Sequence, residues 1–130
     1  DVDQARRLFG AVGVIVEVDE KEIDAVTALA GSGPAFVYTV IEALAQGGER
    51  EGLSPEVALQ LATQTVLGAA QLASESYATP DELRKMVITL GGTTAAGLAA
   101  MEELQTSEGL ARAIEAASRR GREMAEEAAR

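Results

Sequence analysis

The chain has 130 residues and a formal net charge of −10, and 47% of its residues are hydrophobic but only 3% aromatic. This length suffices for one domain with a core, while the negative charge argues against nucleic acid and anionic membrane as partners. Cysteine and histidine are absent, which excludes disulfides, a thiol nucleophile and a histidine-based metal site. Because alanine and leucine dominate and small side chains let helices approach closely, we expect an all-α protein.

The sequence carries no recognisable targeting segment. We identify neither a signal peptide nor an apolar run of membrane-spanning length. The lack of cysteine is compatible with the cytosol. We therefore expect a soluble, cytoplasmic protein with no membrane partner.

The N-terminal residues combine a short helical pattern with a strand-like segment. The helical pattern runs from Gln4 to Phe9 and ends at Gly10. Residues 12–18, VGVIVEV, are dense in β-branched side chains, which is typical of a strand. Because a lone strand leaves its backbone groups unpaired, it must pair with another chain, pack irregularly or belong to a sheet outside this sequence. We expect one short strand here, at a cut through a larger protein.

Capping signals and apolar periodicity predict about six helices after this strand. Asp19 caps the first, Pro34 stands in the first turn of the second, and Ser54 precedes the third. Residues 79–82, TPDE, form a capping box that opens the fourth. The predicted ranges are 20–30, 34–45 or on through Gly48, 55–76, 80–88, 93–104, and 107 to near the C-terminus.

The helix predicted at residues 55–76 is apolar on more than one face. It carries Leu61 and Leu67 beside small residues such as Ala58 and Ala62. A helix of this kind is buried centrally or at a subunit interface, and one short chain has too few other helices to cover it. We therefore expect a second copy to bury it, in an interface of well over ~1,000 Å² per subunit.

The last predicted helix divides into an apolar and a charged face. Leu110 and Ile114 begin an inner stripe. Residues 119–122, RRGR, stand beside the glutamates of residues 123–127. This pattern is typical of a solvated charged face, so we assign Arg119, Arg120 and Arg122 no ligand.

Residues 90–98, LGGTTAAGL, contain the strongest candidate for a ligand site. Gly91 and Gly92 permit a sharp turn, and Thr93 and Thr94 follow at the start of a helix. Free backbone N–H groups, the helix dipole and two hydroxyls together suit a carboxylate or a phosphate. The alternative is structural: the glycines make a tight turn and Thr93 caps the helix.

Several sequence blocks point together to one family. They are TALAGSGPAF at 27–36, EALAQGG at 42–48, GLS at 52–54, VLGAA at 66–70, PDELR at 80–84 and GGTT at 91–94. With these blocks, in this order and spacing, the chain resembles the pyrroline-5-carboxylate reductases, the enzymes of the last step of proline synthesis. The resemblance extends from about Leu8 to Arg122.

The resemblance implies that the chain is one part of a two-domain enzyme. In that family an N-terminal Rossmann domain binds NADPH or NADH, and an all-helical C-terminal domain forms an interlocked dimer and supplies the substrate pocket. No G-x-G-x-x-G motif is present here, so we expect no bound cofactor and no activity from this chain alone. On this interpretation residues 1–18 are a remnant helix and strand of the cofactor domain. Residues 19–130 are the dimerisation and substrate-binding domain.

The resemblance also assigns a substrate-binding role to the turn at Thr89, Gly91, Gly92, Thr93 and Thr94. In the family the matching turn holds the substrate carboxylate, and Thr94 matches the threonine that contacts the ring nitrogen. We assign no catalytic residue and no metal ligand. Because the family's pocket is completed by the partner subunit and the cofactor domain, we expect this chain to bind a proline-like carboxylate only weakly.

A second segment, formed by Gly31, Ser32, Gly33 and Pro34, corresponds in the family to a loop that faces the cofactor and the dimer partner. Small residues there leave room for a ligand. The alternative is that these residues only break a helix. We expect a homodimer, and the sequence leaves open whether dimers assemble further.

Some residues depart from the family's pattern. Thr89 and Leu90 stand where the family usually has Ser-Pro, so the turn loses a stiffening proline. Glu49 and Glu51 replace apolar residues, which makes burial there expensive, and Tyr77 stands where an acidic residue is common. These changes suggest, as an alternative, an engineered fragment or a redesigned helical oligomerisation scaffold. A third alternative is an enzyme that works with a cofactor domain on another chain, docked at the orphan strand.

Overall fold

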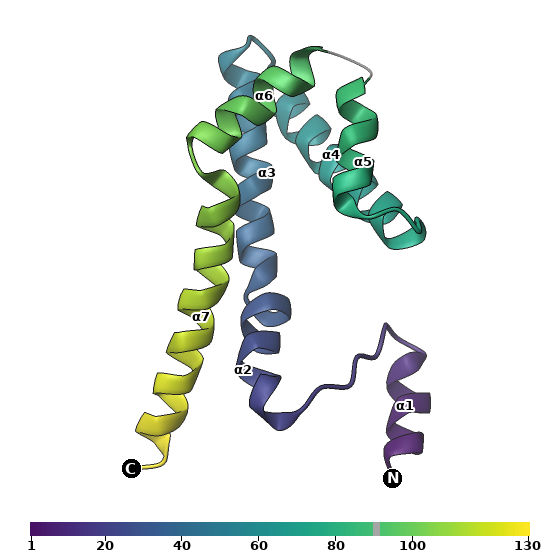
Figure 1. Cartoon of the computed structure of the whole chain (residues 1–130), viewed down its shortest axis with the longest axis vertical. Helices are drawn as coiled ribbons and strands as arrows, with labels where there is room; N and C mark the ends of the chain where they lie inside the picture. The colour runs from purple at the N-terminus through teal and green to yellow at the C-terminus, as the bar shows by residue number, and fades with distance from the viewer. Residues whose placement is uncertain (90–91) are drawn as a thin grey trace.

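The computed structural model describes residues 1–89 and 92–130, and the regular structure in these ranges is helical (Figure 1). The expected all-α class is therefore confirmed. In chain order the elements are α1 (Val2–Gly10), the 3-10 turn η1 (Glu20–Glu22), α2 (Ile23–Val26), the π turn η2 (Thr27–Gly31), α3 (Gly33–Arg50), α4 (Pro55–Glu75), α5 (Pro80–Thr89), α6 (Gly92–Glu103) and α7 (Thr106–Ala128).

The strand expected at residues 12–18 is not formed in the described part of the chain. Residues 14–19 form no helix or strand and pair with no other segment. They connect α2 to α1, which lies apart from the other helices (Figure 1). The prediction was wrong because a strand is completed by hydrogen bonds to a neighbour, and this segment has no second strand beside it. The β-branched composition of residues 12–18 favours an extended backbone, but a strand forms only when a second segment supplies its hydrogen-bond partners.

The elements α2, η2 and α3 follow one another as an almost continuous helical column (Figure 1). The break predicted at residues 31–34 is present as a change of helix type. In the π turn η2, the amide of Ser32 donates to the carbonyl of Thr27 at 3.0 Å. Pro34 then lies in the first turn of α3, where its missing N–H costs no hydrogen bond. The helix continues to Arg50, slightly beyond its predicted end.

α3 and α4 form a helical hairpin that holds the main apolar contact within the chain. Ala45, Ala58 and Ala62 are buried where the two helices meet. The approach is closest near Gly48, where a Cβ would lie 3.1 Å from Cδ1 of Leu53 and 3.4 Å from Cβ of Ala58. Small side chains therefore set the spacing of the hairpin, as the alanine-rich composition indicated.

The predicted caps are present at the starts of α4 and α5. Oγ of Ser54 accepts a hydrogen bond from the amide of Val57 at 3.3 Å. Before α5, the amide of Glu82 donates to Oγ1 of Thr79 at 3.2 Å, and the amide of Thr79 donates to the Glu82 carboxylate at 2.7 Å. This reciprocal pair is the expected capping box, so the start of α5 is determined locally.

α6 and α7 meet at a sharp corner, and α7 then runs back along α3, η2 and α2 (Figure 1). Gln105 makes the corner with a left-handed backbone, φ 53° and ψ 39°, which a residue with a side chain rarely adopts. Near the far end, α7 approaches α2 at Gly121, where a Cβ would lie 3.2 Å from Oδ1 of Asp24. The lack of a side chain at Gly121 thus lets α2 lie against α7.

A single copy of the chain exposes far more surface than a compact protein of its mass. Its accessible surface is 10605 Å², whereas a folded monomer of 13.5 kDa exposes about 6,500 Å². The hydrophobic residues buried in the described part of the chain are all alanines: Ala28, Ala45, Ala58 and Ala62. One copy therefore has no core of large side chains, and about 4,000 Å² of surface is in excess.

Residues Glu20–Arg50 form a helical stretch of 31 residues with a mean hydropathy of 1.3 in its most apolar window. By length and composition alone this stretch could cross a membrane, so the expectation that no such run exists was wrong. Only 17% of that window is buried within one copy. α4 and α7 nevertheless both pack against this column, which marks it as the centre of a helical assembly.

Candidate functional site

The predicted substrate turn lies between α5 and α6. Leu90 and Gly91 lie outside the described residues, so the glycine turn itself is a prediction that stays open. Thr89 is the last residue of α5, and Gly92 is the first of α6. Thr93 is exposed and Thr94 half-buried in the first turn of α6. The threonines therefore stand where first-turn N–H groups lack partners within the helix, as the anion-site interpretation requires.

The second predicted segment, residues 31–34, lies on a different part of the molecule. Gly33 and Pro34 border an apolar hollow of about 620 Å³ between α3 and α7, together with Phe36 and Leu110. In Figure 1 the start of α6 lies at one end of the molecule, whereas η2 lies well along the column toward the other end. One copy of the chain thus does not bring the two predicted segments together.

A further hollow of about 680 Å³ lies at the corner between α5, α6 and α7. Its lining includes Arg84, Met101, Glu102 and Gln105. The sequence did not indicate this hollow, although the polar run at residues 105–108 marks the connection between the helices. The guanidinium of Arg84 is already hydrogen-bonded within α5 to Asp81, so the hollow is not a ready anion site.

Among the described residues, the side chains with shifted pKa values take part in ion pairs at the surface. Hydrogen bonding to Lys85, with a smaller contribution from Arg84, lowers the pKa of Asp81. Hydrogen bonding and charge attraction from Arg6 lower the pKa of Glu17. Both carboxyls are exposed, so these pairs stabilise local structure only modestly and prepare no acid or base for catalysis.

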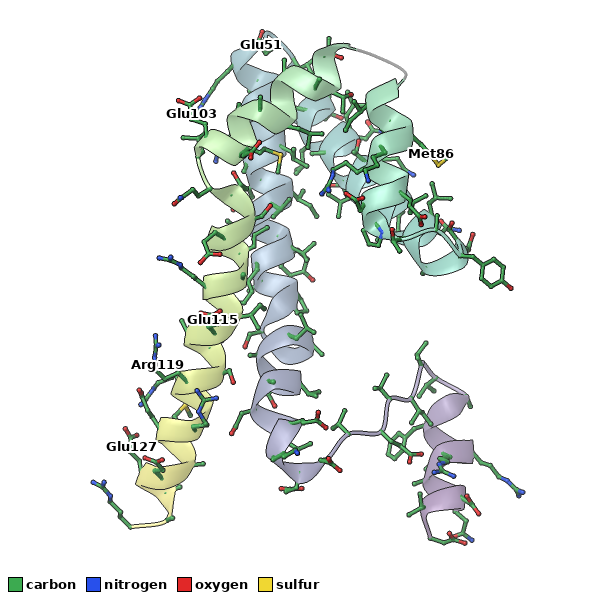
Figure 2. The ribbon with its side chains drawn as sticks, in the orientation of Figure 1. Glu51, Met86, Glu103, Glu115, Arg119 and Glu127 are labelled. Carbon is green, nitrogen blue, oxygen red and sulfur yellow. The ribbon has the colours of Figure 1, made fainter. Side chains whose placement is uncertain are left out.

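The charged face predicted on α7 is confirmed. Arg120 Nη1 lies 3.3 Å from a Glu123 oxygen and 3.0 Å from a Glu127 oxygen. Figure 2 shows Arg119 and Glu127 on the side of α7 turned away from α3. Arg122 differs, because its guanidinium donates to the hydroxyl of the buried Ser118 at 2.9 Å. The contacts of Arg120 and Arg122 therefore lie within α7 and stabilise that helix.

Large apolar side chains of α3 and α4 form an extensive exposed surface. Large side chains along both helices are about half exposed, although a compact protein would cover them. A shallow hollow of about 190 Å³ lies on this face, bordered by Leu44, Leu53, Leu61 and Thr65. The large exposed residues of the two helices are Val37, Tyr38, Leu44, Val57, Leu59, Leu61, Leu67 and Leu72. We call these eight residues the hairpin face.

Comparison with known proteins relates this chain to one enzyme family. A family model described as "Pyrroline-5-carboxylate reductase dimerisation" matches residues 20–124. Pyrroline-5-carboxylate reductase from Arabidopsis thaliana is 50% identical over 119 residues, which are 92% of this chain and 43% of that protein. The enzyme of the same name from Methanosarcina acetivorans is 46% identical over 124 residues, 95% of this chain and 46% of that protein.

Solved structures agree in fold. The pyrroline-5-carboxylate reductase of Coxiella burnetii superposes with a TM-score of 0.88 at 36% identity, over 94% of this chain and 46% of that one. The Plasmodium falciparum pyrroline carboxylate reductase with NADP bound gives a TM-score of 0.85 at 34% identity, over 95% of this chain and 49% of that one. The chain spans about half the length of these relatives. It belongs to the pyrroline-5-carboxylate reductase dimerisation family.

Proposed function

We propose that this chain is the homodimerisation and substrate-binding half of a pyrroline-5-carboxylate reductase. The full enzyme would reduce 1-pyrroline-5-carboxylate to L-proline with NADPH or NADH. The observation that carries this proposal is the excess surface of one copy, 10605 Å² against about 6,500 Å² for a compact monomer. Since stable interfaces remove about 800 Å² or more per partner, the excess leaves ample surface for an obligate dimer.

The positions of the apolar surfaces support an interlocked dimer. The hairpin face and the hollow between α3 and α7 meet on α3, where Val37 and Tyr38 belong to both surfaces. A helix from a second copy that enters either surface would offer its own hairpin face in return, because a two-fold interface uses the same patch twice. Small residues such as Gly33 and Ala62 permit the close approach that such packing needs.

The dimer also accounts for the separation of the two predicted site segments. Within one copy, the first turn of α6 and residues 31–34 lie apart (Figure 1). We infer that the partner's residues 31–34 approach the turn that carries Gly92, Thr93 and Thr94. The first-turn amides of α6 would then hold a substrate carboxylate, and the hydroxyl of Thr94 would orient the ring nitrogen.

The helix starts in residues 1–22 do not fit a pyrophosphate group. Asp1 caps α1 and Asp3 lies in its first turn, and the next helical turn, η1, carries Glu20 and Glu22. Carboxylates at these positions repel a pyrophosphate rather than cradle it. We therefore place the nicotinamide cofactor on a separate domain, with residues 1–18 as its adjoining remnant and residues 19–130 as the helical domain.

Because the pocket needs the partner and the cofactor domain, this chain alone should bind a proline-like carboxylate weakly. Immobilising a small ligand at one helix terminus open to water gains little free energy. Isothermal titration of the chain with L-proline should give a dissociation constant no tighter than about 1 mM. Micromolar binding would contradict the incomplete-pocket argument without affecting the dimer.

A helical oligomerisation scaffold without a functional pocket remains the second candidate. The departures from the family's pattern that suggest it include Glu49 and Glu51, and both residues are exposed near the end of α3. Figure 2 shows Glu51 at the outer end of the molecule. Their exposure means that the two carboxylates cost little in this fold. Addition of a cofactor domain and NADPH separates the candidates, since a scaffold yields no turnover.

Light scattering after size-exclusion chromatography tests the assembly directly. The proposal predicts a mass of twice 13.5 kDa, or a multiple of it, that persists on dilution to low micromolar concentration. A folded monomer with unchanged helix content would contradict it, because the hairpin face would then be stable in water.

A further inference from the structure

The apolar hollow between α3 and α7 has a backbone carbonyl beside it that lacks its regular donor. The hollow measures about 620 Å³, and none of the described side chains that border it is charged. Pro34 borders it and has no N–H to donate to the carbonyl of Ala30, its partner in a regular α-helix. The next amide, that of Ala35, donates to the carbonyl of Ser32 at 3.0 Å. Because Ala30 also borders the hollow, this acceptor lies beside the apolar space.

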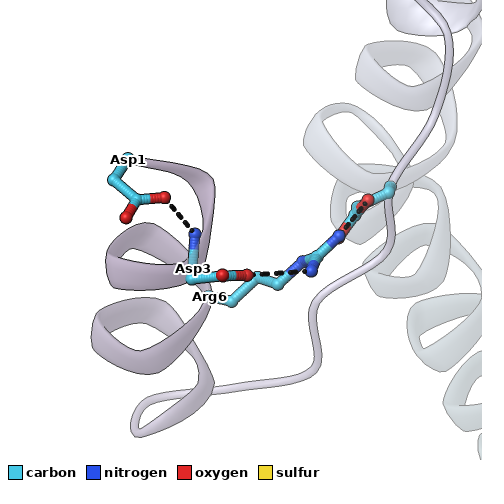
Figure 3. Close-up of polar contacts among 4 residues, drawn as sticks. Asp1, Asp3 and Arg6 are labelled. Carbon is cyan, nitrogen blue, oxygen red and sulfur yellow. Dashed lines mark hydrogen bonds and ion pairs between the residues drawn. The ribbon is translucent and has the colours of Figure 1, made fainter.

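An acceptor beside an apolar space favours a neutral donor. Burial of a carbonyl without a donor costs free energy, and a hydrogen bond recovers it. A charged donor is disfavoured, because no described side chain around the hollow compensates a charge. Cations are also engaged elsewhere, as Arg6 is with Asp3 and Glu17 (Figure 3). The hollow therefore suits a flat apolar ring that ends in one hydroxyl, which is a tyrosine side chain.

The chain has two tyrosines, and one of them lies at the rim of this hollow. Tyr38 is 65% exposed on α3, so it does not fill the hollow of its own copy. In the part of the chain that the structure describes, its hydroxyl has no hydrogen-bond partner. Burial of an aromatic ring is strongly favourable. Both the ring and the hydroxyl of Tyr38 thus lack a contact that such a hollow can supply.

The position of Tyr38 beside the hollow suits exchange between two copies. A two-fold interface uses the same patch on both copies, so an axis that passes beside Tyr38 brings each ring to the hollow of the other copy. Tyr77 lacks this arrangement, because it lies in the connection between α4 and α5, which stands away from the column (Figure 1). Tyr38 also belongs to the hairpin face, so the contact continues the interface proposed above.

Given that dimer, we propose that Tyr38 of each copy enters the hollow of the other copy and donates its hydroxyl hydrogen to the carbonyl of Ala30 there. The ring then packs between α3 and α7 of the second copy, beside Leu110 and Ile114. The second copy thus contributes a side chain to the hollow that borders Gly33 and Pro34, and the hollow of one copy alone is incomplete.

Exchange of bulk between the ring and the hollow tests this contact. Gly33 borders the hollow, and one copy places nothing within 4 Å of a Cβ at this position. Gly33→Leu should therefore be tolerated within one copy but should exclude the ring of the other. We expect Gly33→Leu to weaken the dimer about tenfold, and Tyr38→Ala about 30-fold. The double variant should dimerise no more weakly than Tyr38→Ala alone, because the added leucine side chain then meets no ring.

The hydroxyl is tested separately. Tyr38→Phe keeps the ring but removes the donor, and it should weaken the dimer about fivefold. Tyr77→Phe makes the same change at a fully exposed position and is the matched control, for which we expect no change. Pro34→Ala restores an N–H that can donate to the carbonyl of Ala30, so Tyr38→Phe should cost less in that background.

Sedimentation equilibrium measures the dissociation constants of all these chains. The contact is disproved if the wild type is a dimer and the losses from Gly33→Leu and Tyr38→Ala simply add, since the ring then lies outside the hollow. An equal loss from Tyr38→Phe with and without Pro34→Ala would exclude the carbonyl of Ala30 as the acceptor. A monomeric wild type would instead contradict the proposed function.

Discussion

The α3–α4 hairpin and the N-terminal unit, residues 1–19, are both rich in small and β-branched apolar residues, yet they differ in completeness. The hairpin buries Ala45, Ala58 and Ala62 against each other within one copy. The N-terminal unit buries none of its residues. Helices satisfy their own backbone and need a partner only for side chains, whereas a strand needs a partner for both. This difference explains why the hairpin forms within one copy while the strand does not.

The largest effect is expected from a substitution that prevents a second copy from packing on the hairpin face. Leu61→Glu places a charge at a residue that is 53% exposed in one copy and lies beside the shallow hollow of the hairpin face. Burial of that charge in a two-fold interface should weaken the dimer by about 100-fold or more. Sedimentation equilibrium measures the change, and Tyr77→Glu, at a fully exposed position before α5, is the control.

A dimer that tolerates Leu61→Glu as well as it tolerates Tyr77→Glu would show that the hairpin face is not the interface. Circular dichroism should accompany the measurement. A monomer that loses helix content on dissociation would indicate an obligate dimer, in which folding and assembly are coupled.

Overpacking inside the hairpin gives a smaller effect within one copy. Gly48→Val should cost about 1–3 kcal/mol relative to Gly47→Val, because only Gly48 faces side chains at contact distance. Chemical denaturation of both variants measures the difference, and the shared helix-propensity change cancels. Gly13→Val supplies the contrast from the N-terminal unit, since no atom lies within 4 Å of a Cβ there. Equal stability of the Gly48 and Gly47 variants would mean that the hairpin spacing is set elsewhere.

The smallest expected effect is a pH dependence at the start of α5. The pKa of Asp81 is lowered by Lys85 and Arg84, so its carboxylate stabilises the folded state above its unfolded pKa, and this contribution disappears as pH falls through the folded value. Thermal unfolding of wild type and Asp81→Asn should therefore differ near neutral pH and converge in acid, once the Asp81 carboxylate is protonated in the folded state as well. If the difference in melting temperature persists in acid, the effect of Asp81 on stability does not come from the charge of its carboxylate.

Local signals predicted the helices well because caps act over a few residues. Ser54 and the Thr79–Glu82 pair begin their helices as the sequence indicated. The break at residues 31–34 was also recognised, although its form as a π turn depends on packing against α7. The break between the helices at residues 104–107 was predicted, but the left-handed backbone of Gln105 was not, because it does not follow from a residue type that prefers helices.

The candidate site was predictable only in part. Gly92, Thr93 and Thr94 do begin a helix, which the glycine–threonine pattern indicated. The separation between the start of α6 and residues 31–34 in one copy could not be predicted from the sequence, since it depends on how α4 and α7 fold back along α3 (Figure 1). The strand was mispredicted because pairing is a property of two segments, and composition describes only one.

The central claim is that a second copy covers the hairpin face. It is tested most directly by isotope-filtered nuclear Overhauser spectroscopy on an equimolar mixture of labelled and unlabelled chains refolded together. The account predicts intermolecular contacts from the methyl groups of Leu59, Leu61 and Leu67, which are about half exposed in one copy. A dimer without intermolecular contacts from these methyl groups would contradict it.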